Sequence, residues 1–167
     1  MTEVQIILGL VLLQRLAELW IARRNTERLL SEGAVEIGAE HYPYFVVLHA
    51  TWLAVLVLLT PDHAEADWNW LTLYLLLQVA RLWVMLSLGR FWTTRILTLP
   101  GAKLVQRGPY RYIRHPNYLV VAGEIAVLPL VFGHWGMAAL FTVLNGVLLS
   151  VRIRLENEAL AQRQALD

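Results

Sequence analysis

The sequence predicts an all-α membrane protein, a polytopic helix bundle of about five transmembrane helices whose last two form a helical hairpin. Three observations predict this class. Of the 167 residues, 57% are hydrophobic and 16% are charged, which is more apolar than an ordinary soluble domain. The apolar residues gather in five stretches. Lys and Arg outside these stretches fall only in alternate connections, as expected of a multi-pass protein.

The five apolar stretches set the expected spans. A membrane helix needs about 20 apolar residues, so the third stretch qualifies alone while the second, fourth and fifth are short. Only Gly133 and His134 separate the last two stretches, which predicts the tight hairpin. We expect one integrated membrane domain, with three helices in residues 1–88 and a connector plus two helices in residues 89–167. The stretches cover residues 4–21, 43–59, 68–88, 118–132 and 135–151.

The distribution of basic residues predicts the orientation. The connection at residues 60–67 holds three acids and no Lys or Arg, and the short N-terminus has no basic residue either. Positive charge favours the cytoplasmic side, so we expect a bacterial inner-membrane protein with a periplasmic N-terminus and a cytoplasmic C-terminus. The basic residues of the other connections and the tail are Arg23, Arg24, Arg28, Arg90, Arg95, Lys103, Arg107, Arg111, Arg114, Arg152, Arg154 and Arg163.

Several polar or ionisable side chains lie inside the expected spans. Such groups are costly in lipid, so they face a bundle interior or a cavity, either as contacts between helices or as functional groups. Arg15 and Glu18 stand three residues apart and can pair on one helix face, and Gln78 and Arg81 share that spacing. The sequence leaves both interpretations open for Arg15, Glu18, His49, Gln78, Arg81 and Glu124.

The connector at residues 89–117, with the start of the fourth stretch, is long, basic and aromatic. Pro100-Gly101 and Gly108-Pro109 predict turns, and residues 102–105 between them are expected to be extended. His115-Pro116 predicts the start of a helix. Free N–H groups at such turns and helix starts suit an anionic or polar ligand. The alternative is a basic collar that contacts anionic lipid headgroups.

A second polar cluster ends the last apolar stretch. Arg152 and Glu156 are four residues apart, so they share one helix face. They form either an intrahelical salt bridge or one wall of a site. The predicted topology places them on the same side of the membrane as the RHPNY stretch at residues 114–118. Two polar clusters that meet beside an apolar bundle are suited to an amphipathic substrate.

Three short motifs, in this order, resemble a known family. Gly108-Pro109-Tyr110, the RHPNY stretch and the pair Arg152 and Glu156 are similar to the signature of the isoprenylcysteine carboxyl methyltransferase family, over roughly residues 104–160. The longer run from SLGRFWTTR to RHPNYLVV resembles a bacterial branch of that family. The resemblance implies an integral-membrane methyltransferase that uses S-adenosylmethionine in a cytoplasmic-side pocket, with a lipophilic acceptor that arrives from the bilayer.

The resemblance also implies roles for single residues. Residues 102–105 would line the adenosine through their backbone, and Tyr110 would pack on it. Residues 115–118 would hold the methionine part, which Glu156 would bind by hydrogen bonds. Arg152 matches the position that faces the acceptor, and a guanidinium suits an anionic oxygen because it stays charged and donates two parallel hydrogen bonds. The implied cofactor-binding residues are Ala102, Lys103, Leu104, Val105, Tyr110, His115, Pro116, Asn117, Tyr118 and Glu156.

Other chemistries find little support in the sequence. The absence of cysteine excludes disulfides, thiolate metal sites and cysteine nucleophiles. The five histidines are scattered over separate segments, so we expect no metal site, and we expect no nucleic-acid partner. Membrane lipids and a lipophilic small molecule are the expected partners, while the oligomeric state stays open.

The sequence leaves alternatives open for the methyl acceptor and for the class of reaction. The bacterial branch resembles enzymes that O-methylate long-chain alkylpyrones and alkylresorcinols, so the acceptor oxygen belongs to a carboxylate, an enol or a phenol. The fourth stretch reads YLVVAGE, where many relatives have glycine directly after the tyrosine. The alternatives to a methyltransferase are a membrane reductase of the sterol-reductase kind that binds NADPH, and a non-enzymatic scaffold that binds anionic lipid.

Overall fold

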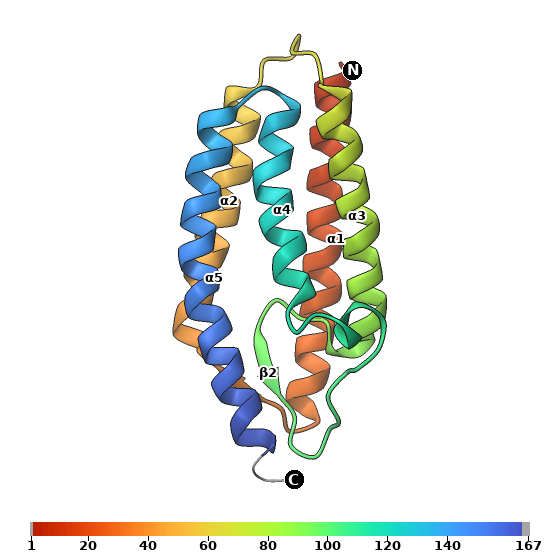
Figure 1. Cartoon of the computed structure of the whole chain (residues 1–167), viewed down its shortest axis with the longest axis vertical. Coiled ribbons are helices and arrows are strands. Elements are labelled where there is room, and N and C mark those ends of the chain that lie inside the picture. Colours follow the sequence, from red (N-terminus) through yellow and green to blue (C-terminus); the bar gives the residue numbers. More distant parts are fainter. Residues whose placement is uncertain (1, 165–167) are drawn as a thin grey trace.

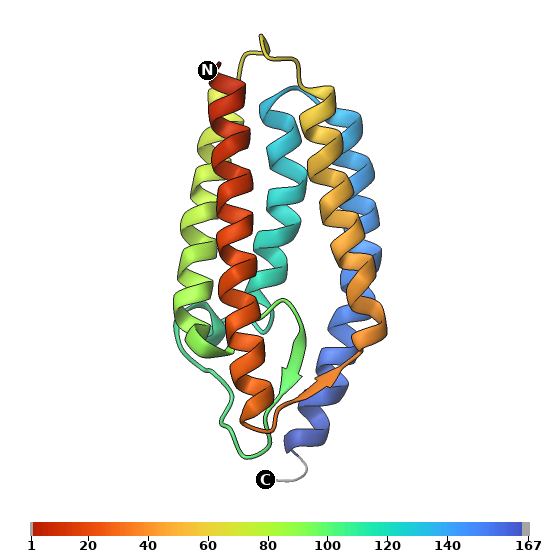
Figure 2. The ribbon, with the colours of Figure 1, turned by 180° about the vertical axis from the view of Figure 1, so that it is seen from behind.

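The computed structural model describes the backbone of residues 2–164 and the side chains of residues 2–159. Arg163 of the predicted basic tail therefore lies outside the described side chains. Residues 2–164 form a bundle of five α-helices with one small sheet at its lower end (Figures 1 and 2). The helices are α1 Glu3–Ser31, α2 Tyr42–Leu59, α3 Trp68–Leu88, α4 Pro116–Val131 and α5 Trp135–Gln164.

The predicted all-α membrane bundle is confirmed. Over the described residues α1, α2, α3 and α5 are long and apolar enough to cross a membrane, whereas α4 is a shorter apolar helix. The predicted hairpin between α4 and α5 is present, with Gly133 at a φ of 75° in the turn between them. A positive φ is easily reached only by glycine, which explains the glycine at this turn.

Two helices run further than their apolar stretches. α1 continues from the expected end at residue 21 to Ser31, and its polar last turns carry the pairs Arg23–Glu27 and Arg28–Glu32, at 2.9 and 3.1 Å. α5 continues from residue 151 to Gln164 through a run of Arg, Leu, Glu, Ala and Gln, which are strong helix formers. Both extensions project from the same end of the bundle (Figure 1).

A two-stranded sheet draws two distant connections together at this end. Strand β1, Val35–Ile37, pairs antiparallel with strand β2, Ile96–Thr98, and Glu36 lies opposite Leu97. Arg95 adds a two-pronged contact, because its Nη1 donates to both carboxylate oxygens of Glu36 at 2.8 Å. The segment after α1 is thereby fixed to the connector before α4. Short 3₁₀ turns at Ala39–His41, Gly89–Phe91 and Gly108–Arg111 complete the described elements.

The interior of the bundle changes character along its length. At the end that carries residues 60–67, all five helices contribute to one apolar cluster. At the end with the sheet, polar and apolar side chains together line a cavity. The buried members of the apolar cluster are Val4, Leu8, Val11, Trp52, Leu56, Ala66, Leu71, Tyr74, Ile125, Val127, Leu128, Val131, Phe132, Met137 and Phe141.

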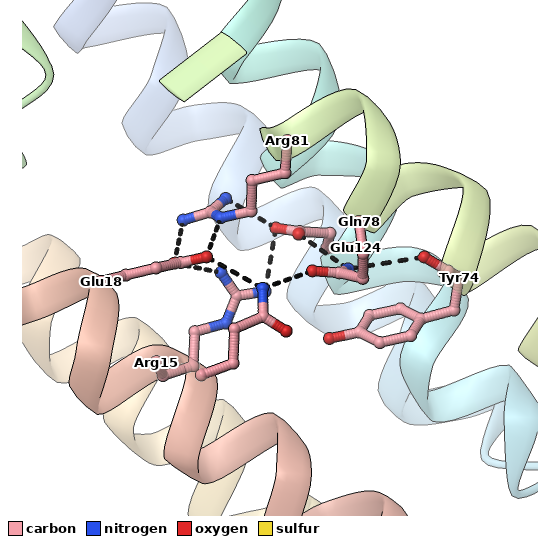
Figure 3. A network of polar contacts seen from close by, with 7 residues as sticks. Arg15, Glu18, Tyr74, Gln78, Arg81 and Glu124 are labelled. Carbon is pink, nitrogen blue, oxygen red and sulfur yellow. Dashed lines mark hydrogen bonds and ion pairs between the residues drawn. The ribbon is translucent and has the colours of Figure 1, made fainter. Parts of the chain in front are cut away.

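Between these two ends lies a buried layer of charged side chains (Figure 3). Arg81 of α3 donates from Nε to Glu18 of α1 at 2.6 Å and from Nη1 to Glu124 of α4 at 2.9 Å. Arg15 of α1 lies 3.0 Å from both Glu18 and Glu124. We call the following six residues the ionic layer: Gln14, Arg15, Glu18, Gln78, Arg81 and Glu124.

The ionic layer settles one question that the sequence left open. The Arg15–Glu18 pair forms, and it joins helices α1, α3 and α4 rather than lining a cavity. His49, by contrast, makes a local contact in which its Nδ1 lies 2.7 Å from the carbonyl oxygen of Phe45 one turn earlier in α2. Arg15, Glu18, Gln78, Arg81 and Glu124 therefore make contacts between helices.

Candidate functional site

A cavity of about 670 Å³ opens at the end of the bundle that carries the sheet. This volume lies in the range of pockets that hold small molecules and cofactors. The connector between α3 and α4, the first turn of α4 and the last turns of α5 form its walls. The residues named from the sequence that line it are Lys103, Leu104, Val105, Tyr110, His115, Asn117, Tyr118, Arg152 and Glu156. Ala102 and Pro116 adjoin this wall without lining it.

Tyr118 joins the two polar residues of α5. Its hydroxyl accepts a hydrogen bond from Arg152 Nε at 3.0 Å and donates one to Glu156 Oε2. Among the described side chains Arg152 and Glu156 form no direct ion pair, although they stand one helical turn apart. The intrahelical salt bridge considered from the sequence is therefore absent, and a residue of α4 takes its place. The predicted meeting of the RHPNY stretch with the end of α5 is observed.

His115 lies on the other side of the same carboxylate. Its Nδ1 is 3.5 Å from Glu156 Oε2, and its Nε2 is 3.1 Å from Asn157 Oδ1. The ring stacks on that of Tyr118, with centroids 5.3 Å apart. The hydrogen bond to Glu156 raises the pKa of His115 above its ordinary value, in spite of partial burial. Glu156 therefore contacts both the Tyr118 hydroxyl and the His115 ring.

The guanidinium of Arg152 is held in place but is not saturated. It lies over the rings of Phe45 and Tyr118, at 5.1 and 5.7 Å from their centroids. Its Nη2 donates to the carbonyl oxygen of Thr94 at 2.8 Å, and its Nε is taken by Tyr118. Arginine has five N–H donors, and Nη1 bonds to none of the described residues. A preoriented donor therefore remains for a ligand.

Two further polar atoms at the cavity are buried and lack a hydrogen-bond partner among the described residues. They are the acceptor Oδ1 of Asn117 and the donor Nε1 of Trp92. An unsatisfied buried polar group costs about 1–3 kcal/mol, so native structures rarely keep one without a reason. The cavity wall therefore holds one acceptor and one donor of this kind, while others, such as the Tyr74 hydroxyl, lie elsewhere in the bundle.

The connector reaches the cavity by packing on the end of α3. Gly108 has a φ of 58°, and a Cβ there would overlap the Ser87 hydroxyl, so only glycine fits. Arg107 Nε donates to the Ser87 carbonyl oxygen at 2.7 Å. These two contacts explain the Gly-Pro turn found in the sequence, and they carry Tyr110 into the cavity wall. Burial there raises the pKa of the Tyr110 hydroxyl.

Sequence reasoning missed one whole wall of the cavity. Strand β2 and the residues before it line the cavity, and they are placed by pairing with β1, by the Arg95–Glu36 contact and by the Arg95 guanidinium over the Tyr42 ring at 4.4 Å. The sequence feature that could have predicted this wall is the dense run of aromatic and basic residues before residue 98. The missed lining residues are Leu88, Phe91, Trp92, Thr93, Arg95, Ile96, Leu97, Thr98, Gln106, Arg114, Asn157 and Ala159.

Among the described residues, no group of three His, Asp or Glu side chains lies close enough together to hold a metal ion. The sequence of the chain matches the family model of the isoprenylcysteine carboxyl methyltransferase (ICMT) family over residues 70–162, more than half of its length. The chain belongs to this family. The matched region includes every residue of the cavity wall, so the ICMT-like part of the chain and the cavity coincide.

Two relatives extend the similarity over nearly the whole chain. YpbQ of Bacillus subtilis (strain 168), an uncharacterised protein, is 39% identical over 94% of this chain and 96% of its own length. An uncharacterised protein of Haemophilus influenzae (strain ATCC 51907 / DSM 11121 / KW20 / Rd) is 24% identical over 96% of both chains. No solved structure matches the chain. ICMT-family membership makes this protein a membrane methyltransferase in general terms.

Proposed function

We propose that this protein transfers a methyl group from S-adenosylmethionine to an oxygen of a lipophilic acceptor that lies in the membrane. The observation that carries the proposal is the convergence, in one cavity at the end of the bundle, of the family motifs and of unsatisfied polar atoms. The connector and helices of residues 89–167 would build the cofactor site, resting on the three helices of residues 1–88.

The residues at the cavity fit the proposed cofactor. Its methionine part carries an ammonium and a carboxylate, which match the free acceptor of Asn117 and the free donor of Trp92. Glu156 and the protonated form of His115 add one charge of each sign. Lys103, Leu104 and Val105 offer backbone groups in a segment outside any helix or strand, with Ala102 and Pro116 as neighbours.

When bound, S-adenosylmethionine supplies an electrophilic methyl carbon on a sulfonium, to which an oxygen nucleophile bonds as the carbon–sulfur bond breaks. Arg152 would hold that nucleophile with the donor that it leaves free and would lower the pKa of an acidic hydroxyl through charge attraction. Tyr118 would keep Arg152 in place and connect it to Glu156. Tight alignment of the two reactants is the main catalytic contribution expected of such a site.

The side of the membrane follows from the chemistry of the cofactor, which is a cytosolic metabolite. The cavity lies at the end of the bundle away from residues 60–67 (Figure 1), so it would be cytoplasmic if the N-terminus is periplasmic. Reporter fusions at residue 64 should then report the periplasm, and fusions at residues 33 and 103 the cytoplasm. A periplasmic signal at residue 103 would contradict the proposed site.

The deciding experiment is a binding measurement followed by a turnover assay. Isothermal titration of the detergent-solubilised protein with S-adenosylhomocysteine should show binding, and NADPH should show none. The reverse result would favour the reductase, and binding of neither would favour a lipid-binding scaffold. Methyl incorporation is then followed by mass spectrometry with long-chain alkylpyrones, alkylresorcinols and prenylcysteine analogues, which offer enol, phenol and carboxylate oxygens.

A further inference from the structure

The first turn of α4 carries Asn117 and Tyr118, two residues of the cavity wall. After Tyr118 the helix reads LVVAGEIAVLPLV, so Glu124 is its one remaining polar side chain. Apolar side chains in a bundle tolerate rotation and sliding better than hydrogen bonds do, because a hydrogen bond has a narrow optimum in distance and angle. The orientation of α4 therefore depends strongly on the contacts of Glu124.

Both carboxylate oxygens of Glu124 have hydrogen-bond or ion-pair partners. Glu124 Oε2 lies 2.9 Å from Arg81 Nη1 and 3.0 Å from Arg15 Nη2, and Oε1 accepts from Gln78 Nε2 at 3.0 Å. The carboxylate thus ties α4 to α1 and to two turns of α3 (Figure 3). Its side chain is 3% exposed. Because the ionic layer holds two arginines and two glutamates, its formal charges cancel.

The residue before Glu124 sets the spacing between α4 and α3. A Cβ at Gly123 would lie 3.0 Å from Leu77 Cδ2, so the end of the Leu77 side chain would have to move by a few tenths of an ångström. The absence of a side chain at Gly123 therefore favours the close packing of α4 on α3 at the level where Gln78 and Arg81 reach Glu124.

The geometry of an α-helix carries this constraint to the cavity. Asn117 stands seven residues before Glu124, which is two turns and about 10 Å along the axis, on nearly the same face. A rotation of α4 would turn Asn117 and Glu124 together. It would also move the Tyr118 hydroxyl, whose contacts with Arg152 and Glu156 reach across to α5.

We propose that Glu124 is a positioning residue that fixes the rotation and depth of α4, and thereby directs Asn117 and Tyr118 into the cavity. It touches neither the cavity nor the proposed reactants, and it acts through the helix. The ligand-binding part of its test rests on the proposed function, whereas the structural part does not.

Glu18 provides a matched control within the same layer. It accepts hydrogen bonds from Arg81 at 2.6 Å and from Arg15 at 3.0 Å, so it is as deeply embedded in the layer as Glu124. It joins α1 to α3, however, and among the described residues it forms no hydrogen bond or ion pair with α4. Glu18→Gln and Glu124→Gln each remove one carboxylate and the same charge, but only the second loosens α4.

Affinity for S-adenosylhomocysteine is measured for both variants at a temperature well below their melting points. Glu124→Gln should bind about tenfold more weakly, equivalent to one charge-assisted hydrogen bond at the site, and Glu18→Gln should bind nearly as wild type does. The double variant Arg15→Gln/Glu124→Gln restores the charge balance of the ionic layer but not the carboxylate at position 124. Its affinity for S-adenosylhomocysteine should therefore stay as low as that of Glu124→Gln. Equal losses in both single variants, or full recovery in the double variant, would overturn the positioning role.

A second measurement does not depend on any ligand. The chain has no cysteine, so cysteines introduced at the exposed positions Leu119 in α4 and Val147 in α5 can carry the only two spin labels. Pulsed electron–electron double resonance measures the distance between the two labels. The distribution of this distance should be shifted or broadened in Glu124→Gln and unchanged in Glu18→Gln. Unchanged distances in both would overturn the proposal. If wild type binds no S-adenosylhomocysteine, the proposed function fails while the spin labels still decide the role of Glu124.

Discussion

Two Arg–Glu pairs have nearly the same spacing along their helices, but only one of them forms a direct ion pair. Arg15 and Glu18, three residues apart on α1, form an ion pair at 3.0 Å within the ionic layer. Arg152 and Glu156, four residues apart on α5, are separated by the Tyr118 hydroxyl, which bonds to both. Spacing along one helix therefore makes a pair possible, and the neighbouring helix decides whether it forms.

The ionic layer and the polar side chains around the cavity differ in how many of their polar atoms have hydrogen-bond partners. Every carboxylate oxygen of the ionic layer accepts at least one hydrogen bond or ion pair, and the charges cancel. Around the cavity, Asn117 Oδ1, Trp92 Nε1 and the Nη1 group of Arg152 lack partners among the described residues. A saturated cluster has nothing left to offer a ligand, so it holds helices together. The cavity cluster keeps polar groups without partners among the described residues, as the proposed ligand site requires.

The largest expected effect comes from breaking the saturated cluster. Arg81→Ala leaves Glu18 and Glu124 buried with fewer donors, and loss of one partner of a buried pair costs about 3–5 kcal/mol of unfolding free energy. Arg23→Ala breaks an exposed pair of 2.9 Å on the same α1 helix and should leave stability unchanged, because water screens it. Reversible unfolding in mixed micelles measures both. If both variants lost a similarly small amount of unfolding free energy, the ionic layer would not be what holds the helices together.

Breaking the unsaturated cluster should affect turnover rather than folding. Arg152→Ala removes the donor proposed for the acceptor oxygen, and loss of such a donor lowers turnover about 100- to 1,000-fold. Arg152→Lys should recover little, because a point charge cannot replace a planar two-pronged donor. Binding of S-adenosylhomocysteine should stay near that of wild type in both variants.

Arg154 is the matched control for this prediction, since it lies on the same helix and is exposed. Arg154→Ala should keep full turnover on the best acceptor of the panel. Full turnover by Arg152→Ala would instead make Arg152 an interfacial anchor.

A smaller effect is expected on cofactor affinity. His115→Ala and Glu156→Ala would each remove proposed hydrogen bonds to a charged ligand, worth about 1.5–3 kcal/mol, or roughly ten- to a hundredfold in affinity. Glu158→Ala changes an exposed acid two residues from Glu156 and should leave affinity unchanged. Titration calorimetry with S-adenosylhomocysteine, together with melting in detergent, separates binding from folding. Wild-type affinity in both site variants would remove these residues from the cofactor site.

The spans could be predicted from the sequence because hydropathy depends on neighbours along the chain. The expected stretch 68–88 coincides with α3, and the expected stretch 43–59 differs from α2 by one residue. The contact between Tyr118 and the end of α5 was within reach, because the charge pattern puts both segments on one side of the membrane.

Contacts that depend on the packing of helices could not be predicted. Glu124 meets Arg81 and Arg15 only because α4 packs beside α3 and α1, and hydropathy carries no information on which helices are neighbours. Strands β1 and β2 are three residues each, too short to show an alternating pattern. Their pairing brings Trp92 and Arg95 to the cavity, so that wall stayed hidden.

The smallest expected effect is a pH dependence centred on His115. The hydrogen bond to Glu156 raises the pKa of His115, so the charged ring interacts more favourably in the folded protein than in the unfolded chain. That stabilisation is fully present below the ordinary histidine pKa of about 6.5 and is lost as the pH rises through the higher folded value. It is small because the side chain remains partly exposed and solvent screens the pair.

Nuclear magnetic resonance can follow this titration directly, once the His115 signal is assigned by its disappearance in His115→Gln. Glu156→Gln should bring the pKa of His115 down toward its ordinary value, whereas Glu158→Gln, which changes an exposed acid, should leave it raised. The His115–Glu156 contact would be absent in solution if both variants kept the wild-type titration. A lowered His115 pKa in Glu156→Gln alone would show that Glu156 interacts with His115 at the cavity, as the structure places them.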